Sequence, residues 1–447
     1  MKIHIKPLGG SHNALLAKAL FAAFLTSVAA QGLAQSGTNS PYSQFGLGTL
    51  AQQASGFNRG MNGLAIGFHD GNQVNYINPA SYAYTDSLTF LFDMGLSGQI
   101  TNFSENGTKR NVKEANFEYA VAGFRLARRL GMSFGILPYT NVGYNYSSSG
   151  YINGRNSVSY TNSYTGSGGL HQVYAGLGWS PFKHFAIGVN GGYLWGNISR
   201  SVTNSYSDNY ANTLSKTYSA EVRSYMLSAG LQYDMRLNKK DMLTIGLTYG
   251  LGHKIGGDPT CRVISTNSQT SVSDSLVLGG KNLELKVPHS FGAGLLYNHD
   301  NRLRLGVDYS LQKWGSVAFP EYRTVSETEV SYVMNDSYFK DRHQVTLGTD
   351  FLPNPSSRSL LSRIHYRAGV SYTTPYIKVN GKDGPSEISG SLGFGIPIVN
   401  SYNNRSFLNI SAQFAHSSAN GLISENIFRI NIGLTFNEKW FQKWKVE

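Results

Sequence analysis

The segment that most constrains the fold is residues 427–436, where apolar residues alternate with polar or small ones at every step. Successive side chains of a strand point to opposite faces, so Phe428, Ile430, Ile432, Leu434 and Phe436 share one face. A strand with one face suited to hydrocarbon and the other to water is typical of a transmembrane β-barrel. An exposed strand of a soluble sandwich alternates in the same way, so the rest of the chain must decide between the two.

The same alternation recurs along the chain between clusters of Gly, Asn, Ser and Pro. It predicts strands at residues 88–100, 114–126, 132–146, 170–179, 185–195, 220–233, 242–251, 283–297, 303–314, 339–351, 363–372, 388–398, 407–414 and 427–436. This is about fourteen strands, an even number, as single-chain bacterial barrels have. We therefore expect an all-β fold, a transmembrane antiparallel barrel whose last strand pairs with residues 88–100.

The predicted connections alternate in length. Short links are expected at residues 127–131, 180–184, 234–241, 298–302, 352–362 and 399–406. Longer polar loops are expected at residues 101–113, 147–169, 197–219, 252–282 and 315–338, with shorter ones at 373–387 and 415–426. A membrane barrel sorts its connections into short periplasmic turns and long external loops, whereas a soluble sandwich has no reason to do so.

The N-terminus and the composition indicate export to the bacterial outer membrane. Residues 1–34 have three early lysines, a short apolar run and a small-x-small site, which together predict a secretory signal peptide. The 50 Gly, 28 Tyr and 23 Phe, with only 14% charged residues, fit girdle aromatics and small lumen residues. The formal charge of +12 falls to about +9 when the three lysines of the expected signal are subtracted, and this positive charge invites an anionic partner. Nucleic acid is a poor candidate in the envelope, so we expect basic turns beside outer-membrane lipid head groups.

Between the signal and the first strand, residues 35–86 do not alternate and are long enough to fill a lumen. Their ordered motifs include Arg59-Gly60, Gly63 and Asn78-Pro79-Ala80. In these motifs the chain resembles the long-chain fatty-acid transporter (FadL) family of outer-membrane barrels. The resemblance implies a barrel of fourteen strands plugged by an N-terminal hatch. The expected domains are then a signal peptide (1–34), the hatch (35–86), the barrel (87–436) and a periplasmic tail (437–447).

Asn78-Pro79 marks a fixed turn, because proline restricts the residue before it to extended geometry. This turn either holds the hatch against the wall or is an ordinary turn before the first strand. Inward positions on later strands carry charged residues that could contact a ligand or the plug, namely Arg304, Asp308, Arg342, Arg367 and Arg429. An arginine can bind a ligand carboxylate, although wall-to-plug ion pairs are the more common role.

No arrangement of residues predicts catalysis, a metal site or a cofactor. His289, His343 and His365 lack a nucleophile and an orienting group at a recognisable spacing, and the only cysteine is Cys261. Glycine-rich residues 166–169 and 188–192 lack the strand-to-helix context of a phosphate loop. The protein is therefore not expected to be an enzyme.

The end of the chain predicts partners. Residues 431–436 resemble the closing signal by which outer-membrane barrels are recognised by the barrel assembly machinery, and residues 437–444 look like the tails of family members from Bacteroidota. Two functions stay open. The first is a channel for passive uptake of hydrophobic or amphipathic small molecules, fatty-acid-like or aromatic, gated by the hatch. The second is a structural, secretion-associated or assembly-associated barrel that binds protein partners.

Overall fold

The structure is a computed structural model that describes residues 37–105, 107–152, 155–267, 269–280, 283–326, 329–398 and 406–438. The expected signal peptide (1–34) and most of the expected tail (437–447) lie outside these residues. Within the described ranges, no helix has the length and apolar character needed to cross a membrane.

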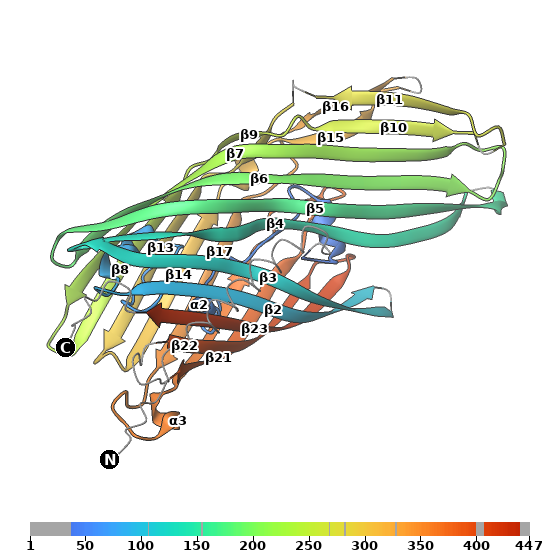
Figure 1. Ribbon diagram of the computed structural model, residues 1–447. Coiled ribbons are helices and arrows are strands. Elements are labelled where there is room, and N and C mark those ends of the chain that lie inside the picture. The colour runs from blue at the N-terminus through green and yellow to red at the C-terminus, as the bar shows by residue number, and fades with distance from the viewer. Residues whose placement is uncertain are drawn as a thin grey trace, which may run out of the picture. The chain divides into compact units, whose positions relative to one another are not determined.

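The described chain forms a closed antiparallel barrel (Figure 1). Of the 17 strands in the main sheet, β1, β10 and β11 lie outside the closed ring, which leaves 14. In chain order the ring is β2 (Phe90–Glu105), β3 (Thr108–Ala127), β4 (Leu130–Ile152), β5 (Arg155–Phe182), β6 (Phe185–Tyr206), β7 (Thr213–Arg236), β8 (Asp241–Gly250), β13 (Ser290–His299), β14 (Leu303–Gln312), β17 (Arg342–Phe351), β18 (His365–Thr373), β21 (Ser386–Ile398), β22 (Ser406–Ser418) and β23 (Ser424–Glu438). The predicted fold class and all fourteen predicted strands are confirmed.

The last strand closes the ring as its alternation predicted. β23 pairs with β2 from Phe90↔Glu438 to Ser104↔Ser424, and with β22 on its other side. Asn431 and Thr435 point inward and are buried, whereas Ile430, Ile432 and Phe436 are exposed on the outer face. The closing pair removes the free sheet edge that would otherwise invite aggregation.

Strand lengths divide the wall into two parts. β8, β13, β14 and β17 have 10 residues each, which matches the 9–11 residues of a tilted transmembrane strand. β4 to β7 have 22 to 28 residues and project far beyond the others (Figure 1). The predicted loops at 101–113, 147–169 and 197–219 are wrong, because most of these residues continue the strands as paired hairpins.

Smaller elements decorate the projecting end. β10 (Thr260–Thr266) extends the sheet from β7, and β11 (Ser273–Gly279) pairs with β10. The remaining strands form three pairs, β9 (His253–Gly256) with β12 (Leu285–Val287), β15 (Phe319–Thr324) with β16 (Val330–Asn335), and β19 (Lys378–Val379) with β20 (Lys382–Asp383). One further short helix is η4 (Trp314–Ser316), and another, α3 (Leu360–Arg363), lies at the opposite end of the barrel in the link between β17 and β18 (Figure 1).

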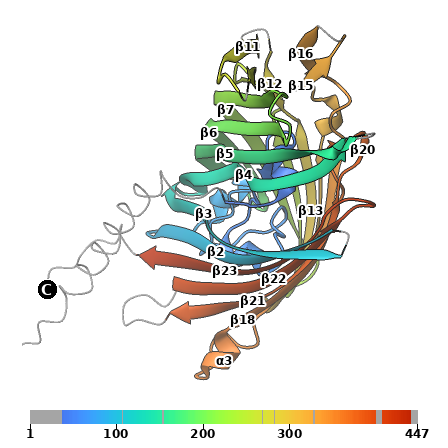
Figure 2. The same ribbon diagram turned by 90° about the vertical axis from the view of Figure 1, so that its right-hand side faces the viewer.

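Residues 37–89 lie inside the ring, where Figure 2 shows them in blue. They form η2 (Pro41–Gln44), β1 (Thr49–Leu50), α2 (Gly56–Arg59) and η3 (Pro79–Tyr84), joined by irregular chain. Most of the side chains between Ala54 and Ala83 are buried. We call residues 56–84 the anchored stretch and residues 37–54 the gap stretch, since the two meet different parts of the wall.

Candidate functional site

A row of inward-facing glycines forms the seat of the anchored stretch. Neighbouring strands place these glycines opposite one another, as in Gly348↔Gly369, Gly306↔Gly348 and Gly188↔Gly230. A Cβ on Gly393 would lie 2.6 Å from the Cα of Gly60, which is closer than real Cβ contacts allow. Similar close approaches to the anchored stretch occur at Gly131, Gly178, Gly188, Gly230, Gly246, Gly294, Gly306, Gly348, Gly369 and Gly433. The missing side chains let one backbone lie directly on another around most of the ring.

Arg59 ties the beginning of the anchored stretch to the wall. Its side chain is almost fully buried, with Nη2 2.8 Å from Glu118 Oε2 and Nη1 donating to Asn431 Oδ1 at 3.1 Å. The guanidinium also donates to the carbonyls of Gln52 and Ala54, each at 2.9 Å. Glu118 reaches the lumen because it is the extra residue of a β-bulge in β3, opposite Gly95 and Leu96 of β2. Charged hydrogen bonds of this kind are stronger than neutral ones.

Hydrogen bonds that involve its backbone hold the middle of the anchored stretch. Asp308 of β14 accepts hydrogen bonds from the N–H groups of Ala65 (2.6 Å) and Ile66 (2.8 Å). Asn78 caps η3 by accepting from Ala80 N at 3.1 Å, and Pro79 occupies the first helical turn, where no donor is needed. The Asn78 amide also donates to Ile66 O at 2.8 Å and Leu231 O at 3.2 Å, so this turn joins the segment to β7.

A buried charge cluster meets the anchored stretch at the short-turn end of the barrel. Arg304 lies 3.0 Å from Asp70 of the segment and 3.7 Å from Asp350 of β17. Arg367 contacts Asp350 at 3.1 Å, and its guanidinium lies 3.7 Å from the ring centroid of Phe57. His365 Nδ1 lies 3.0 Å from Asp350 as well. Burial by itself raises the pKa of Asp70, but Arg304 and the N–H of Asn72 outweigh it and leave that pKa below its ordinary value.

The other predicted glycine positions have local roles. The carbonyl oxygen of Gly60 accepts a hydrogen bond from the hydroxyl of Ser391 at 3.1 Å. Gly63 has a φ of +94°, a left-handed conformation that glycine adopts without strain, and follows Asn62, whose φ is +56°. The Asn62 amide donates to Ser371 Oγ and Ser389 Oγ at 2.8 and 2.9 Å. This turn therefore fits the segment against β18 and β21.

The wall parts between β3 and β4 beside the gap stretch. In the described chain, β3 pairs with β2 from Thr108 to Phe124, but with β4 only from Ala120↔Ile136 to Ala127↔Leu130. Beyond that point β4 pairs with β5 and, on its open side, with β1, at Thr49↔Asn141 and Leu50↔Thr140. A two-residue strand of the N-terminal segment thus occupies part of an opening in the barrel ladder.

The gap stretch carries no charged residue of its own, and separate hydrogen bonds hold it, some of them to charged wall residues. The hydroxyl of Tyr42 donates to the carbonyl of Ile423, and that of Tyr376 to the carbonyl of Gly48. Leu47 is buried in an apolar cluster that fills the lumen toward the projecting strands. That cluster also contains Val142, Tyr144, Leu170, Leu194, Ile198, Val222, Trp314 and Phe339.

Two predicted lumen residues lie apart from these anchors, and one important residue was missed. Arg429 donates to Gln99 at 2.8 Å and to Gln413 at 3.2 Å, and Gln413 in turn donates to Asn62. Arg342 interacts electrostatically with Glu387, and no hydrogen bond joins it to the described part of the N-terminal segment. Arg200 donates to the carbonyl of Gly46, a contact that a loop at residues 197–219 does not predict.

The three histidines considered for catalysis lie in different places and make different contacts. His289 and His343 accept or donate hydrogen bonds at the outer face, each 2.8 Å from a tyrosine hydroxyl, of Tyr249 and Tyr309 respectively. His365 is buried inside with Asp350. Their surroundings are those of girdle and structural residues.

Comparisons with known proteins agree with this architecture. Solved structures with the same fold include a FadL homologue from Pseudomonas aeruginosa, with a TM-score of 0.58 and 12% identity over 88% of this chain and 99% of that one. The toluene transporter TodX of Pseudomonas putida has a TM-score of 0.55 and 15% identity over 89% and 99% of the two chains. The toluene transporter TbuX of Ralstonia pickettii has a TM-score of 0.55 and 12% identity over 87% and 98%. At these identities the likeness establishes the fold, and it confirms the resemblance to FadL.

Sequence comparison identifies the family. No curated protein matches the chain. The family model named BamG matches residues 16–447, which is nearly the whole sequence. The chain therefore belongs to the BamG family.

Proposed function

We propose that this protein is a bacterial outer-membrane channel for passive passage of hydrophobic small molecules, fatty-acid-like or aromatic, and that the N-terminal segment is its hatch. The observation that carries the proposal is the opening between β3 and β4, which is occupied by β1 of the hatch. The solved structures of the same fold include toluene transporters and a monoaromatic hydrocarbon channel, which supports the same class of ligand.

The apolar lumen cluster gives such a ligand a path. Tyr144, Leu194, Val222 and Trp314 pack together in the lumen toward the projecting strands, and Leu47 of the gap stretch belongs to the same cluster, so a ligand would pass by separating these side chains. A hydrophobic molecule that enters from the projecting end would stay among apolar side chains until it reaches the gap stretch. Movement of the gap stretch would then release it through the opening, toward the bilayer.

The hatch does not need to leave the barrel for this to happen. The anchored stretch is fixed by Arg59, Asp308 and Asp70, whereas β1 contributes only two residue pairs to the wall. Displacing the gap stretch breaks these two pairs and separate hydrogen bonds such as those from Arg200 and Tyr376, which costs less than separating several buried ion pairs. Gating therefore belongs to the gap stretch.

A reversible disulfide between β1 and β4 tests the proposal. Thr49 and Asn141 lie directly opposite one another. Opposite residues of an antiparallel pair have Cα atoms about 4.5–5.5 Å apart, within the range of disulfides. In a Cys261→Ala background, Thr49→Cys with Asn141→Cys should admit labelled toluene or fatty acid when reduced. When oxidised, uptake should fall to the level of cells that lack the protein.

The matched control places a disulfide where it cannot close the opening. Ile264→Cys with Ser275→Cys joins two opposite residues of the β10–β11 hairpin. Oxidation of this variant should leave uptake unchanged. Equal uptake by the oxidised and reduced β1–β4 variant would show that the hatch does not gate, and absence of uptake in every form would exclude the channel.

A second candidate function is the binding of protein partners on the projecting side. Among the described residues, β11 forms a ladder only with β10, and β16 approaches its other side at Gly279, so the rest of that edge has no strand partner. Leu276 and Val277 on this strand are 45% and 56% exposed. An edge of this kind can accept an extended segment of another protein as an added strand.

Purification in mild detergent distinguishes the two functions. If partner binding is the main role, a stoichiometric protein should copurify with the wild type and be lost when Val277→Pro removes a backbone donor from the edge. A Val272→Pro variant, in the turn before β11, is the control. Copurification that is indifferent to Val277→Pro would rule out this edge as the binding surface.

A further inference from the structure

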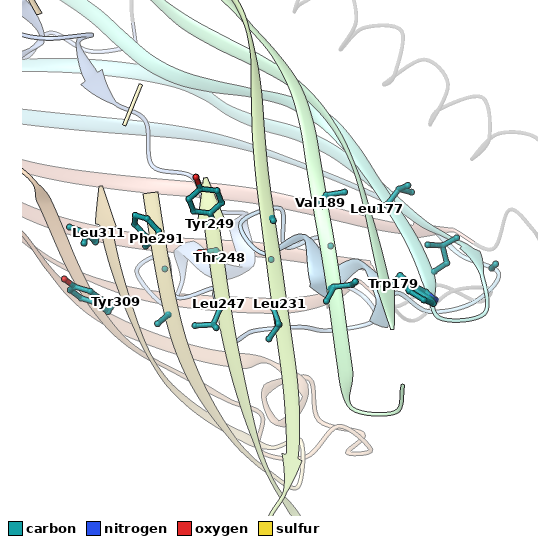
Figure 3. Close-up of a pocket in the computed structure, with 18 of the residues that line it drawn as sticks. Leu177, Trp179, Val189, Leu231, Leu247, Thr248, Tyr249, Phe291, Tyr309 and Leu311 are labelled. Atoms are coloured by element: carbon teal, nitrogen blue, oxygen red, sulfur yellow. The ribbon is translucent and has the colours of Figure 1, made fainter. Parts of the chain in front are cut away.

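An apolar hollow lies on the outer, lipid-facing wall, away from the lumen (Figure 3). Its volume is about 1270 Å³, and it is lined almost wholly by outward-facing apolar side chains. Its floor is formed by the alanines Ala229 and Ala293, and Figure 3 shows Leu177, Trp179, Tyr249 and Phe291 around it. The outside of a barrel is convex, so a hollow there requires small residues in place of large ones.

The strand register explains the shape. Ala229 lies between Val189 of β6 and Tyr249 of β8, and Ala293 lies between Leu247 of β8 and Tyr309 of β14. Each alanine is thus a low point in a lateral row of large side chains. The rows run from β5 to β14, across five interstrand spacings of about 4.8 Å, or about 24 Å in all. The hollow follows these rows, and its volume of about 1270 Å³ is ample for an extended hydrocarbon chain.

The two ends of the hollow differ in charge. Arg128, exposed in the turn between β3 and β4, lines one end. The turn after β5 lies against the same place, because Ser180 N donates to Arg129 O at 2.9 Å, and it carries the exposed Lys183. At the other end, the hydroxyls of Tyr249 and Tyr309 are engaged with histidines, and no cation lines the hollow there. Positive charge is therefore confined to the short-turn end.

We propose that this hollow is a binding site for a phospholipid of the leaflet that faces the short turns. One acyl chain lies across Ala229 and Ala293, and the phosphate faces Arg128, Arg129 and Lys183. The apolar floor matches the chain, and the basic turns match an anionic head group. A membrane-spanning segment of another protein would fill the apolar part but would leave the three basic residues unexplained. This site is independent of the lumen and of the hatch.

Trp179 reports on occupancy, because it lies in the hollow and is half exposed. The full chain is reconstituted into phosphatidylcholine vesicles that contain a small fraction of phospholipid with brominated acyl chains, which quench tryptophan on contact. The Trp179→Phe variant provides the signal of the other tryptophans, which is subtracted. Brominated phosphatidylglycerol should quench Trp179 about fivefold more effectively than brominated phosphatidylcholine, as expected from one additional head-group contact to a basic residue.

Two double substitutions test the acyl-chain part and the head-group part of the site separately. Ala229→Phe with Ala293→Phe fills the floor and should abolish the preferential quenching. Ala412→Phe on β22 adds the same bulk to an outward alanine between Leu392 and Ile430, and should leave the preference unchanged. Arg128→Gln with Lys183→Gln should make the two brominated lipids equivalent, whereas Arg358→Gln in another exposed turn should not.

Three results would overturn the proposal. Quenching by the two lipids in proportion to their mole fraction would show ordinary lipid contact only. A preference that survives Ala229→Phe with Ala293→Phe would place the lipid elsewhere. If neither lipid quenched Trp179 and a polypeptide remained bound, the hollow would be a protein interface.

Discussion

The two stretches of the N-terminal segment are held in different ways although they are continuous in sequence. The anchored stretch lies on the row of glycines and is bound through Arg59, Asp70 and the acceptor Asp308. The gap stretch carries no charged residue of its own. It is held by one short strand and by separate hydrogen bonds, some from tyrosine hydroxyls and some to or from charged wall residues such as Arg200 and Glu425. The difference shows how a plug can be fixed to its barrel and still carry a part that moves. Substitutions that affect one stretch and spare the other test this division.

The largest effect is expected for Arg59→Met. This substitution leaves Glu118 buried without its cation, which costs about 3–5 kcal/mol for a buried pair. The midpoint of denaturant unfolding should fall, and proteases should cut residues 56–84 in the folded barrel. Arg223→Met is the control, because its pair with Glu221 is mostly exposed and contributes at most about 1 kcal/mol. Similar losses in the two variants would contradict the role of Arg59 as an anchor.

Gly393→Val should have the next largest effect. The added Cβ collides with the backbone of Gly60, and overpacking of this kind costs about 1–3 kcal/mol. Limited proteolysis should show that residues 56–84 lose protection. Gly390→Val on the same strand is the control, since the nearest atom to its Cβ is 3.7 Å away. If both variants behave alike, the glycine row is not a seat for the segment.

A smaller effect is expected from acid. Because the pKa of Asp70 is lowered in the folded protein, its contribution is present above the ordinary aspartate pKa of about 3.9 and is lost as the pH falls through the lower folded value. Protection of the anchored stretch should therefore decrease with acidification less in Asp70→Asn than in the wild type. Hydrogen exchange measured at pH 7 and again near pH 3 gives the comparison, and identical pH profiles would refute it.

The smallest effect is expected for Tyr42→Phe, which removes one neutral hydrogen bond of about 1 kcal/mol from the gap stretch. Hydrogen exchange should quicken in residues 37–54 and stay unchanged in residues 56–84. Faster exchange in both stretches would mean that they open as one unit.

The sequence predicts this fold well where one side of a strand meets lipid. The fourteen strands were found because apolar and polar residues alternate across a wall with a dry face and a wet face. The ends of β4 to β7 were interpreted as loops because both of their faces are polar. Their pairing instead uses contacts between strands, such as the stacked rings of Tyr146 and Tyr164, whose centroids are 4.8 Å apart. Arg200 was missed for the same reason.

The sequence predicts individual residues of the candidate site but does not predict which residues pair with one another. Inward parity singled out Arg304, Asp308 and Arg367 on their strands, and the family motifs singled out Arg59 and Asn78. The same parity places Asp350 inward, but its pairing with Arg367 and that of Glu118 with Arg59 depend on contacts between different strands or segments, and Glu118 lies at a bulge that alternation alone does not reveal. A single sequence does not specify such pairs.

The glycine row also constrains how the protein folds. The hatch precedes every barrel strand in the chain, yet its seat is distributed over strands from β4 to β23, so no partial sheet offers the complete surface. Contacts of such long sequence separation form late and slowly. The last of them, Gly56 against Gly433, becomes available only when β23 arrives beside β2. Closure of the barrel and docking of the hatch should therefore occur as a single kinetic step, with the hatch already within the curl of the unfinished sheet.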